Sequence, residues 1–191
     1  MSDLDTLKHL VLAPYILKAT ALIGVNRKVG GNQFRHSFAT LGILLDYKYY
    51  RDSVLLKASL LHDLLEDLPE STVDEIREID SEGHQVVALV LEVTRQKGES
   101  KLQYLDRLLK NGSQNAMVLK CADRISNLTD LHLDTHSKQK ITSYLDQTKR
   151  FVLPMAKKIN HNMVVELTDL IEKRMEILRM TEQENRNKLS V

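Results

Sequence analysis

The chain has little of what several large protein classes need. It has a single cysteine, Cys121, so an internal disulfide framework is excluded, and such usage fits a reducing compartment. It has no run of about 18 apolar residues, so no membrane span is predicted. Its start, residues 1–5, lacks the basic segment and the apolar centre of a signal peptide. We therefore expect a cytoplasmic protein without a membrane partner.

The charges are balanced, and the glycine motifs of common nucleotide-binding loops are missing. There are 27 basic and 26 acidic side chains, so the chain has no overall signature of polyanion binding. Any attraction for phosphate must be local, and we expect no nucleic-acid partner. Neither a P-loop nor a dinucleotide-binding glycine fingerprint occurs.

Almost every segment shows the helical period in its apolar residues, and no strand-like alternation of any length appears. With 191 residues, 42% of them hydrophobic, the chain is long enough for one domain with a substantial core. We predict an all-α fold, with a single domain of about eight to ten helices over residues 1–181. Residues 182–191 are predicted to form a polar C-terminal tail.

Several boundaries follow from turn and helix signals. Residues 24–35 are the least helical stretch and are predicted to form a loop. A helix should follow over 36–45. A continuous helix is expected over 52–67, and Pro69 should stop it.

Later segments carry equally specific signals. Thr72, with Glu75 three positions later, predicts a capping box that opens a short helix. Two long amphipathic helices are predicted over 137–160 and 161–180, with a kink at Pro154 in the first. Their apolar stripes fit either closure of the core or a dimer, so the oligomeric state stays open.

An apolar helical run contains the most informative residues of the chain. Within Ser59–Asp67, four ionisable side chains stand among leucines: His62, Asp63, Glu66 and Asp67. Burying such groups is costly unless another group, usually a metal ion, compensates their charge. The run therefore predicts a metal site.

Two residues from elsewhere in the chain would complete this site. His62 and Asp63 would project about 100° apart on a helix, so both can converge on one ion. His36 lies upstream and Asp123 downstream, and each would add a ligand from another helix. Two imidazoles and two carboxylates suit Mn²⁺, Fe²⁺, Co²⁺ or Mg²⁺. An ion held this way can acidify its water and polarise a phosphoryl oxygen.

Two further carboxylates lie one helical turn along the same faces. Glu66 is four residues after His62, and Asp67 is four residues after Asp63. We expect Glu66 to be the principal base for an attacking water and Asp67 to be its partner. The alternative for Asp67 is a solvated acid at the end of a helix.

Three motifs carry a family resemblance. They are Arg27-Lys28 ahead of Gly30 and His36, an HDxxED motif over His62–Asp67, and a K-x-A-D-R-x-x-N-L motif over Lys120–Leu128. With these residues the chain resembles the HD-domain alarmone hydrolases, the hydrolase half of RelA/SpoT-type proteins. Its size is similar to that of their stand-alone small relatives. The resemblance runs from Arg27 to Tyr144 and implies an HD-type helical domain.

The resemblance implies an enzyme with one Mn²⁺ ion, other divalent metals being possible. Such an enzyme removes the 3′-diphosphate of ppGpp or pppGpp and gives GDP or GTP plus pyrophosphate. The metal ligands implied are His36, His62, Asp63 and Asp123, and the catalytic residues are Glu66 and Asp67. The implied substrate contacts are Arg27, Lys28, Asn127, Lys140 and Tyr144.

The chain departs from the family pattern near the expected nucleotide. Ser37 replaces the proline after the first histidine, Asn32-Gln33 replaces a Pro-Tyr pair, and Leu68 replaces a threonine. None of these changes removes an expected ligand or catalytic carboxylate. They leave the base preference open. Arg124 we expect to be a structural residue that bridges helices through a carboxylate.

Other functions stay open at this point. Within HD-type chemistry they are a (p)ppApp hydrolase, an NADPH 2′-phosphatase and a nucleoside 5′-monophosphatase. From another class comes a non-catalytic protein that only binds the alarmone. The intact pair Glu66-Asp67 favours an enzyme over that last possibility.

Overall fold

The computed structural model describes the backbone of residues 3–189 and the side chains of residues 5–181. No strand occurs in this part of the chain, apart from an isolated bridge between Asn26 and Asn32. In chain order the elements are α1 Asp3–His9, α2 Ala13–Ala19, the 3₁₀ helix η1 Thr20–Gly24, α3 Gln33–Asp46, α4 Ser53–Leu61, α5 Leu64–Asp67, α6 Val73–Arg77, α7 Gly83–Val93, α8 Lys101–Asn111, α9 Gln114–Thr129, the 3₁₀ helix η2 Leu131–Leu133, α10 Lys138–Gln147, the π-helical turn η3 Thr148–Val152, α11 Leu153–Ile159 and α12 His161–Leu189. The predicted all-α class is confirmed.

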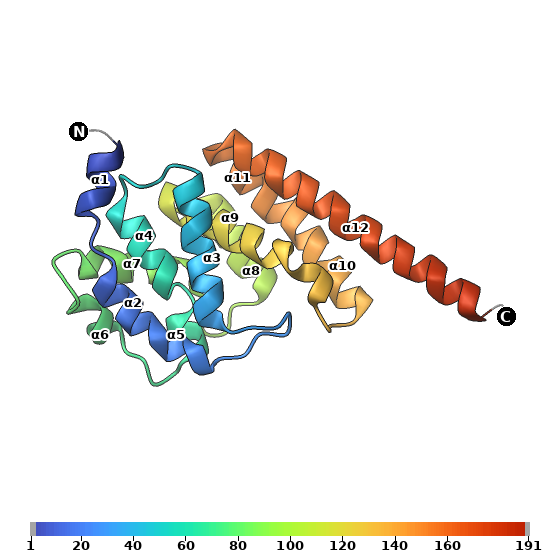
Figure 1. Ribbon diagram of the computed structural model, residues 1–191, viewed down its shortest axis with the longest axis horizontal. Helices are drawn as coiled ribbons and strands as arrows, with labels where there is room; N and C mark the ends of the chain where they lie inside the picture. Colours follow the sequence, from blue (N-terminus) through green and yellow to red (C-terminus); the bar gives the residue numbers. More distant parts are fainter. Residues whose placement is uncertain (1–2, 190–191) are drawn as a thin grey trace.

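Helix α9 lies at the centre of the molecule (Figure 1). It packs against α3 and α7 on one side and against α11 and α12 on the other. Leucine, isoleucine and valine side chains of α9 are buried, and each contributes about 1.5–3 kcal/mol relative to an exposed position. Helix α12 runs along this core and extends beyond it toward the C-terminus (Figure 1). Because α9 is packed on both sides, its polar side chains are held in fixed positions.

A tight turn brings the chain into α3. Gly30 and Gly31 have φ angles of +86° and +69°, which side chains other than glycine rarely adopt. The backbone N–H of Arg27 donates to the carbonyl of Gly31, 3.1 Å away, and closes the turn. Asn32 then caps α3 by accepting from the backbone N–H of Arg35 at 2.9 Å. As a result, His36 lies in the first turn of α3.

The prediction of a continuous helix over 52–67 is wrong at its most important point. Helix α4 ends at Leu61, and α5 begins at Leu64. His62 and Asp63 form the turn between them, with Asp63 at φ −98° and ψ −5°, a region that active-site residues often occupy. The ring of His62 bonds the carbonyl of Ser59, so it turns back over the last turn of α4.

The helical segment over 137–160 is interrupted close to Pro154, where the sequence predicts a kink. The segment expected as one helix over 137–160 consists of α10, the π-helical turn η3 and α11, with Pro154 in the first turn of α11. Proline lacks a donor and crowds the preceding turn, and the wider π turn accommodates it. The capping box at Thr72 and Glu75 is also confirmed.

Helix α12 crosses the predicted domain boundary. Its backbone is helical through Leu189, whereas the side chains of 182–191 lie outside the described residues. The division into 1–181 and 182–191 therefore stays a prediction. Within residues 3–189, none of the helices combines the length and apolar character needed to cross a lipid bilayer.

Candidate metal and active site

Four predicted ligands come together from three parts of the fold. Candidate ligand atoms of His36 in α3, His62 after α4 and Asp123 in α9 all lie within 4.8 Å of one another, and all three residues are buried. The Oδ2 atom of Asp63 lies 3.3 Å from Nε2 of His62 and 3.6 Å from Nε2 of His36. This arrangement can surround one cation.

The hydrogen bonds of His62 leave its inner nitrogen without a partner, whereas the inner nitrogen of His36 lies 3.1 Å from Oδ1 of Asp123. Nδ1 of His62 lies 2.8 Å from the carbonyl of Ser59, and because a carbonyl only accepts, Nδ1 must carry the hydrogen. The neutral ring then has its lone pair on Nε2, which is buried and has no hydrogen-bond partner among the described residues. Nδ1 of His36 similarly pairs with the hydroxyl of Ser126 at 2.9 Å. Metal-bound histidines make such outward bonds.

The electrostatics of this group favour an additional positive charge. Burial lowers the pKa of His62, but the charges of Asp63 and Asp123 outweigh burial and raise that pKa to about 10. The pocket thus strongly prefers a cation at this place, either a proton or a metal ion. Lys120 donates to Oδ2 of Asp123 at 2.6 Å, so the other oxygen of this carboxylate faces the histidines. The donor set, the unpaired nitrogen and the charge all fit a hard or borderline divalent ion.

The two expected catalytic carboxylates line the same cavity as His62 and Asp63. Glu66 is half-exposed, and Nη2 of Arg95 lies 3.9 Å from its Oε1. Asp67 is more enclosed and accepts a hydrogen bond of 2.6 Å from Nε2 of Gln33. Burial and the nearby charge of Asp63 raise the pKa of Asp67, although the bond from Gln33 opposes this shift. Both carboxylates line the cavity, and a carboxylate within hydrogen-bond reach of a water can accept its proton.

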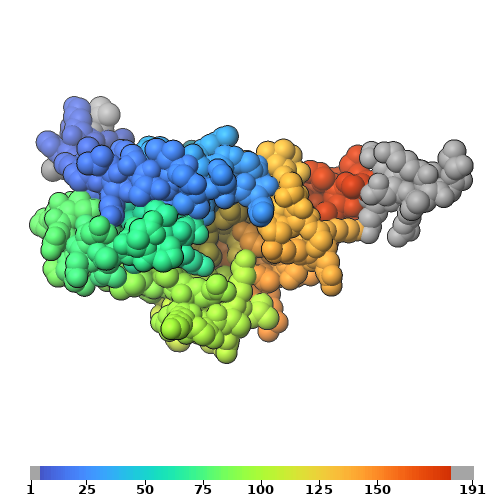
Figure 2. Space-filling model, turned by 90° about the horizontal axis from the view of Figure 1, so that it is seen from below, coloured from blue at the N-terminus to red at the C-terminus, as the bar shows by residue number. Residues whose placement is uncertain are grey.

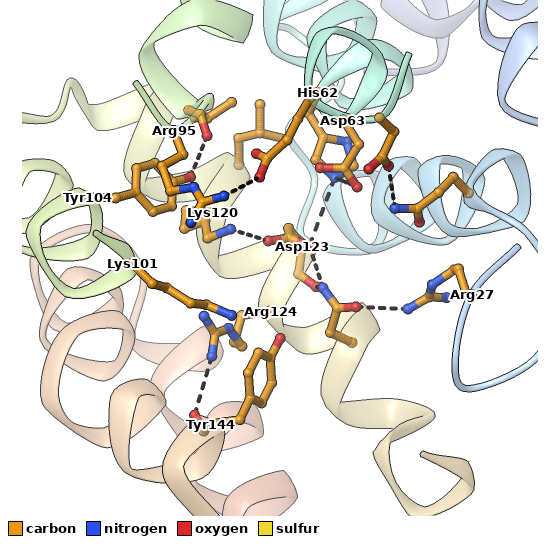
Figure 3. Close-up of a pocket in the computed structure, with 16 residues that line it drawn as sticks. Arg27, His62, Asp63, Arg95, Lys101, Tyr104, Lys120, Asp123, Arg124 and Tyr144 are labelled. Atoms are coloured by element: carbon orange, nitrogen blue, oxygen red, sulfur yellow. Dashed lines mark hydrogen bonds and ion pairs between the residues drawn. The ribbon is translucent and has the colours of Figure 1, made fainter. Parts of the chain in front are cut away.

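Basic side chains form the opposite side of the cavity, whose volume is about 350 Å³. This basic wall consists of Arg95, Lys101, Lys120 and Arg124. Figure 3 shows it facing His62, Asp63 and Asp123. Burial of Lys101 and the charges of Arg124 and Lys120 lower the pKa of Lys101 to about 8. A wall of this kind attracts anions such as phosphoryl groups.

The space-filling view shows which parts of the chain surround the hollow on this side of the molecule. In Figure 2 the blue N-terminal segments lie above this hollow, the green segments to its left, the yellow-green segments below it and the orange region of α10 to its right. The residues that line the cavity come from the start of α3 and the loop before it, from α5 and the turn before it, from the end of α7 and the loop after it, and from α8, α9 and α10. The site is therefore built between parts of the chain that are far apart in sequence.

Arg124 has a different role from the one expected. Only 1% of it is exposed, and it has no carboxylate partner among residues 5–181. Its Nη1 atom donates to the hydroxyl of Thr148 at 2.8 Å, and its guanidinium lies 3.9 Å from the ring centroid of Tyr144. Arg124 does join α9 to the C-terminal helices, but the expected bridge through a carboxylate is wrong. Its charge therefore adds to the basic wall.

The structure brings most of the expected substrate contacts to this region. Nη2 of Arg27 donates to Oδ1 of Asn127 at 2.7 Å, and both residues line the cavity together with Tyr144. Asn127 and Tyr144 also line a neighbouring cavity of about 340 Å³, to which Lys140 contributes. Lys28 is exposed in the turn before α3 and lines neither cavity.

The sequence did not single out several residues of the cavity. Lys120 had a signal, because it precedes Asp123 by three residues on a helix and belongs to the same motif. Arg95 and Lys101 flank a polar loop, which by itself indicates only exposure. Gln33 had no signal, since its partner Asp67 is 34 residues away in the chain.

These shapes and side chains define an HD-type helical domain with a candidate metal site. No family model matches the chain. Among curated proteins, guanosine-3′,5′-bis(diphosphate) 3′-pyrophosphohydrolase MESH1 of Mus musculus is 33% identical over 129 residues, which cover 64% of this chain and 70% of that protein. MESH1 of Homo sapiens matches with the same identity and coverage. The chain therefore belongs to the HD-domain ppGpp hydrolase family.

A solved structure supports the same fold. It is that of a metazoan ortholog of SpoT that hydrolyses ppGpp and plays a role in starvation responses. The TM-score is 0.75 at 24% sequence identity, and the match covers 85% of this chain and 94% of the other. At this identity the likeness establishes the arrangement of the helices.

Proposed function

We propose that this chain hydrolyses the 3′-diphosphate of ppGpp or pppGpp and gives pyrophosphate together with GDP or GTP. The observation that carries the proposal is the buried Nε2 atom of His62, which lacks a hydrogen-bond partner and lies beside two carboxylates. A cation in that place would lie next to Glu66 and Asp67, which we name the acidic pair, and opposite the basic wall. The curated relatives are pyrophosphohydrolases of this substrate.

One Mn²⁺ ion is the metal that we propose for the site. His36, His62, Asp63 and Asp123 would hold it. When bound, such an ion supplies Lewis acidity toward a phosphoryl oxygen and lowers the pKa of a coordinated water. The mixed nitrogen and oxygen donors also suit Fe²⁺ or Co²⁺.

The acidic pair supplies the base for the reaction. Water attacks the phosphorus next to the ribose 3′ oxygen, a new P–O bond forms to the water oxygen, and the bond from phosphorus to the 3′ oxygen breaks. Glu66, with Asp67 beside it, takes the proton that the water loses. The departing 3′ oxygen gains a proton and becomes the hydroxyl of GDP or GTP. The water oxygen therefore ends in pyrophosphate.

The rest of the cavity binds and orients the nucleotide. The diphosphate carries several negative charges, and the basic wall offsets them. The nucleoside extends past Asn127 and Tyr144 toward the second cavity. Arg27, Lys28 and Lys140 supply cations around that path.

The wider setting of the protein follows from the same proposal. The substrate is a small-molecule nucleotide, and the balanced charge of the chain gives no overall signature of nucleic-acid binding. We place the activity in the cytoplasm. Residues 1–181 form the catalytic domain, and residues 182–191 are a polar extension of it.

A labelled-water assay tests the reaction directly. The purified chain with Mn²⁺ and ppGpp in H₂¹⁸O should release pyrophosphate that carries ¹⁸O, and GDP without label. Glu66→Gln should lower kcat by about 100-fold or more, because the base is lost. Glu70→Gln, the same change at an exposed acid outside the cavity, should leave kcat unaltered.

A substrate panel separates the other functions. Faster turnover of ppApp than of ppGpp would indicate adenine preference, and orthophosphate released from NADPH or AMP would indicate a monophosphatase. Tight ppGpp binding with no turnover in Mn²⁺ would mean that the chain is a sensor, and the proposal would be wrong.

A further inference from the structure

Gln33 contacts a catalytic carboxylate but has no part in the reaction proposed for the acidic pair. It is the first residue of α3, and its backbone N–H donates to the carbonyl of Val25 at 2.9 Å. His36 follows in the same helical turn. The backbone of Gln33 is thus fixed by the start of α3 and by the preceding loop.

The side chain of Gln33 reaches across the cavity to α5. Its Nε2 atom donates to Oδ2 of Asp67 at 2.6 Å. An ionised carboxylate only accepts hydrogen bonds, so the amide nitrogen must be the atom that faces Asp67. Bonds to a charged acceptor are shorter and stronger than neutral ones. Among the side chains of residues 5–181, Gln33 is the one hydrogen-bond donor to this carboxylate.

The other end of the amide indicates that stability alone does not explain this contact. Oε1 of Gln33 is buried and has no hydrogen-bond partner in the part of the chain that is described. A buried carbonyl without a partner costs about 1–3 kcal/mol. An apolar side chain of equal length would avoid that cost. The side-chain amide makes a single hydrogen bond, to Asp67, and a buried polar atom without a partner is uncommon enough to call for an explanation.

The neighbouring carboxylate is held much less tightly. Glu66 is half-exposed, and its nearest cation, Arg95, is 3.9 Å away and also half-exposed. Such a pair restricts a side chain little. The two carboxylates of the acidic pair therefore differ, because Asp67 has one oxygen fixed while Glu66 can turn.

We infer that Gln33 is a positioning residue for the hydrolysis, which holds Asp67 with one oxygen bonded and the other free for the attacking water. This inference rests on the proposed function. A base or its partner must lie within hydrogen-bond reach of the proton that it accepts. Removing the donor lets Asp67 rotate away, so the chemical step slows while nucleotide binding is kept.

Two variants of equal length test this role. Gln33→Met fills the same space without a donor, and Gln33→Glu fills it with a second carboxyl group, which repels the charge of Asp67. Each should lower kcat for ppGpp by about 10- to 100-fold, the usual loss for a residue that orients another. KM should stay within about twofold. Gln85→Met, the same change at an exposed glutamine of α7, should alter neither constant.

The rise in Tm that Mn²⁺ produces shows whether a Gln33 substitution merely disturbs the first turn of α3. Gln33 shares a helical turn with His36, so a disturbed turn would weaken metal binding and reduce the rise in Tm that Mn²⁺ produces. A positioning residue for Asp67 leaves that rise unaltered. A loss of kcat together with a loss of the Mn²⁺-dependent rise would overturn the inference.

A double-mutant cycle decides whether Gln33 acts through Asp67. If it does, Gln33→Met should cause no further loss of kcat in the Asp67→Asn background. If the kcat losses of Gln33→Met and Asp67→Asn instead multiply in the double variant, the inference is wrong. It is also wrong if both Gln33 variants keep the wild-type kcat, and in either case the proposed function stands. An inactive wild type would instead contradict the proposed function itself.

Discussion

Within residues 5–181, two clusters of buried and partly buried ionic side chains differ in how completely their charges are paired. In the first, which we name the closed cluster, Nζ of Lys57 donates to Oδ2 of Asp80 and to Oε2 of Glu82, each at 2.6 Å. The hydroxyls of Tyr15 and Ser53 donate to the same two carboxylates at 2.7 Å. The lysine has two opposite charges, and each carboxylate has at least two donors.

The second, which we name the open cluster, consists of His36, His62, Asp63 and Asp123. Its carboxylates attract a cation, yet Nε2 of His62 has no aligned hydrogen-bond partner. The closed cluster joins α2, α4 and the start of α7, whereas the open cluster faces a cavity. This difference indicates that a cluster with a structural role pairs all of its own charges. A cluster that binds a ligand keeps a polar atom unpaired, as Nε2 of His62 is here.

The largest expected effect is loss of the metal. At 100 times its Kd, Mn²⁺ should stabilise the wild type by about 2.7 kcal/mol, and Tm should rise by roughly 5–10 °C. Asp63→Asn should abolish both the rise and ppGpp turnover, measured by calorimetry and by pyrophosphate release. Asp106→Asn, at an exposed i,i+4 pair on α8, should keep both. A full Mn²⁺-dependent rise in Asp63→Asn would contradict our assignment of this ligand.

A substitution in the closed cluster should lower the stability of the protein and leave the effect of Mn²⁺ intact. Lys57→Met leaves two carboxylates without their cation, and because they are partly exposed we expect a loss of about 2–4 kcal/mol in the free energy of unfolding. Urea denaturation measures this loss. The rise in Tm caused by Mn²⁺ should be unaltered. If Lys57→Met removed that rise, the two clusters would not be independent.

Local patterns predicted the parts of the site that lie close together in the chain. The spacing from His62 to Glu66 and from Asp63 to Asp67, and the motif around Asp123, indicated the expected ligands and acids from the sequence alone. The turn at His62-Asp63 was missed, because the surrounding leucines favour an unbroken helix and the ring of His62 bonds Ser59 only once folded.

Contacts between distant segments had no such pattern. Nothing near Gln33 indicates Asp67 as its partner, and nothing near Arg124 indicates Thr148 in place of a carboxylate. The closed cluster was missed for the same reason, since Lys57 finds Asp80 and Glu82 only after α4 and α7 have packed together. Such pairs depend on tertiary packing, which one sequence does not encode in its local spacing.

A smaller effect is expected at Gly83, the first residue of α7, directly after Glu82 of the closed cluster. A Cβ atom there would lie 2.2 Å from the carbonyl oxygen of Arg77, so the backbone would have to shift. We expect Gly83→Ala to cost about 1–3 kcal/mol in the free energy of unfolding. Gly42→Ala is the matched control, because nothing lies within 4 Å of its Cβ position in α3, and it should stabilise by about 0.5–1 kcal/mol. Equal effects at both positions would contradict the close approach.

The smallest effect is a difference in acid stability between the wild type and Lys57→Met. Burial raises the pKa of Asp80, but Lys57 and Tyr15 outweigh burial and hold it below its ordinary 3.8. The bond from Lys57 likewise holds the pKa of Glu82 below 4.5. Carboxyls with depressed pKa values add stability above their unfolded values, and that stability is lost as pH falls through the folded ones. Wild-type stability should therefore decline below about pH 4, and more steeply than in Lys57→Met, where the shifts are smaller. Urea denaturation from pH 7 to pH 3 measures both slopes, and parallel slopes would show that Lys57 does not control these two carboxyls.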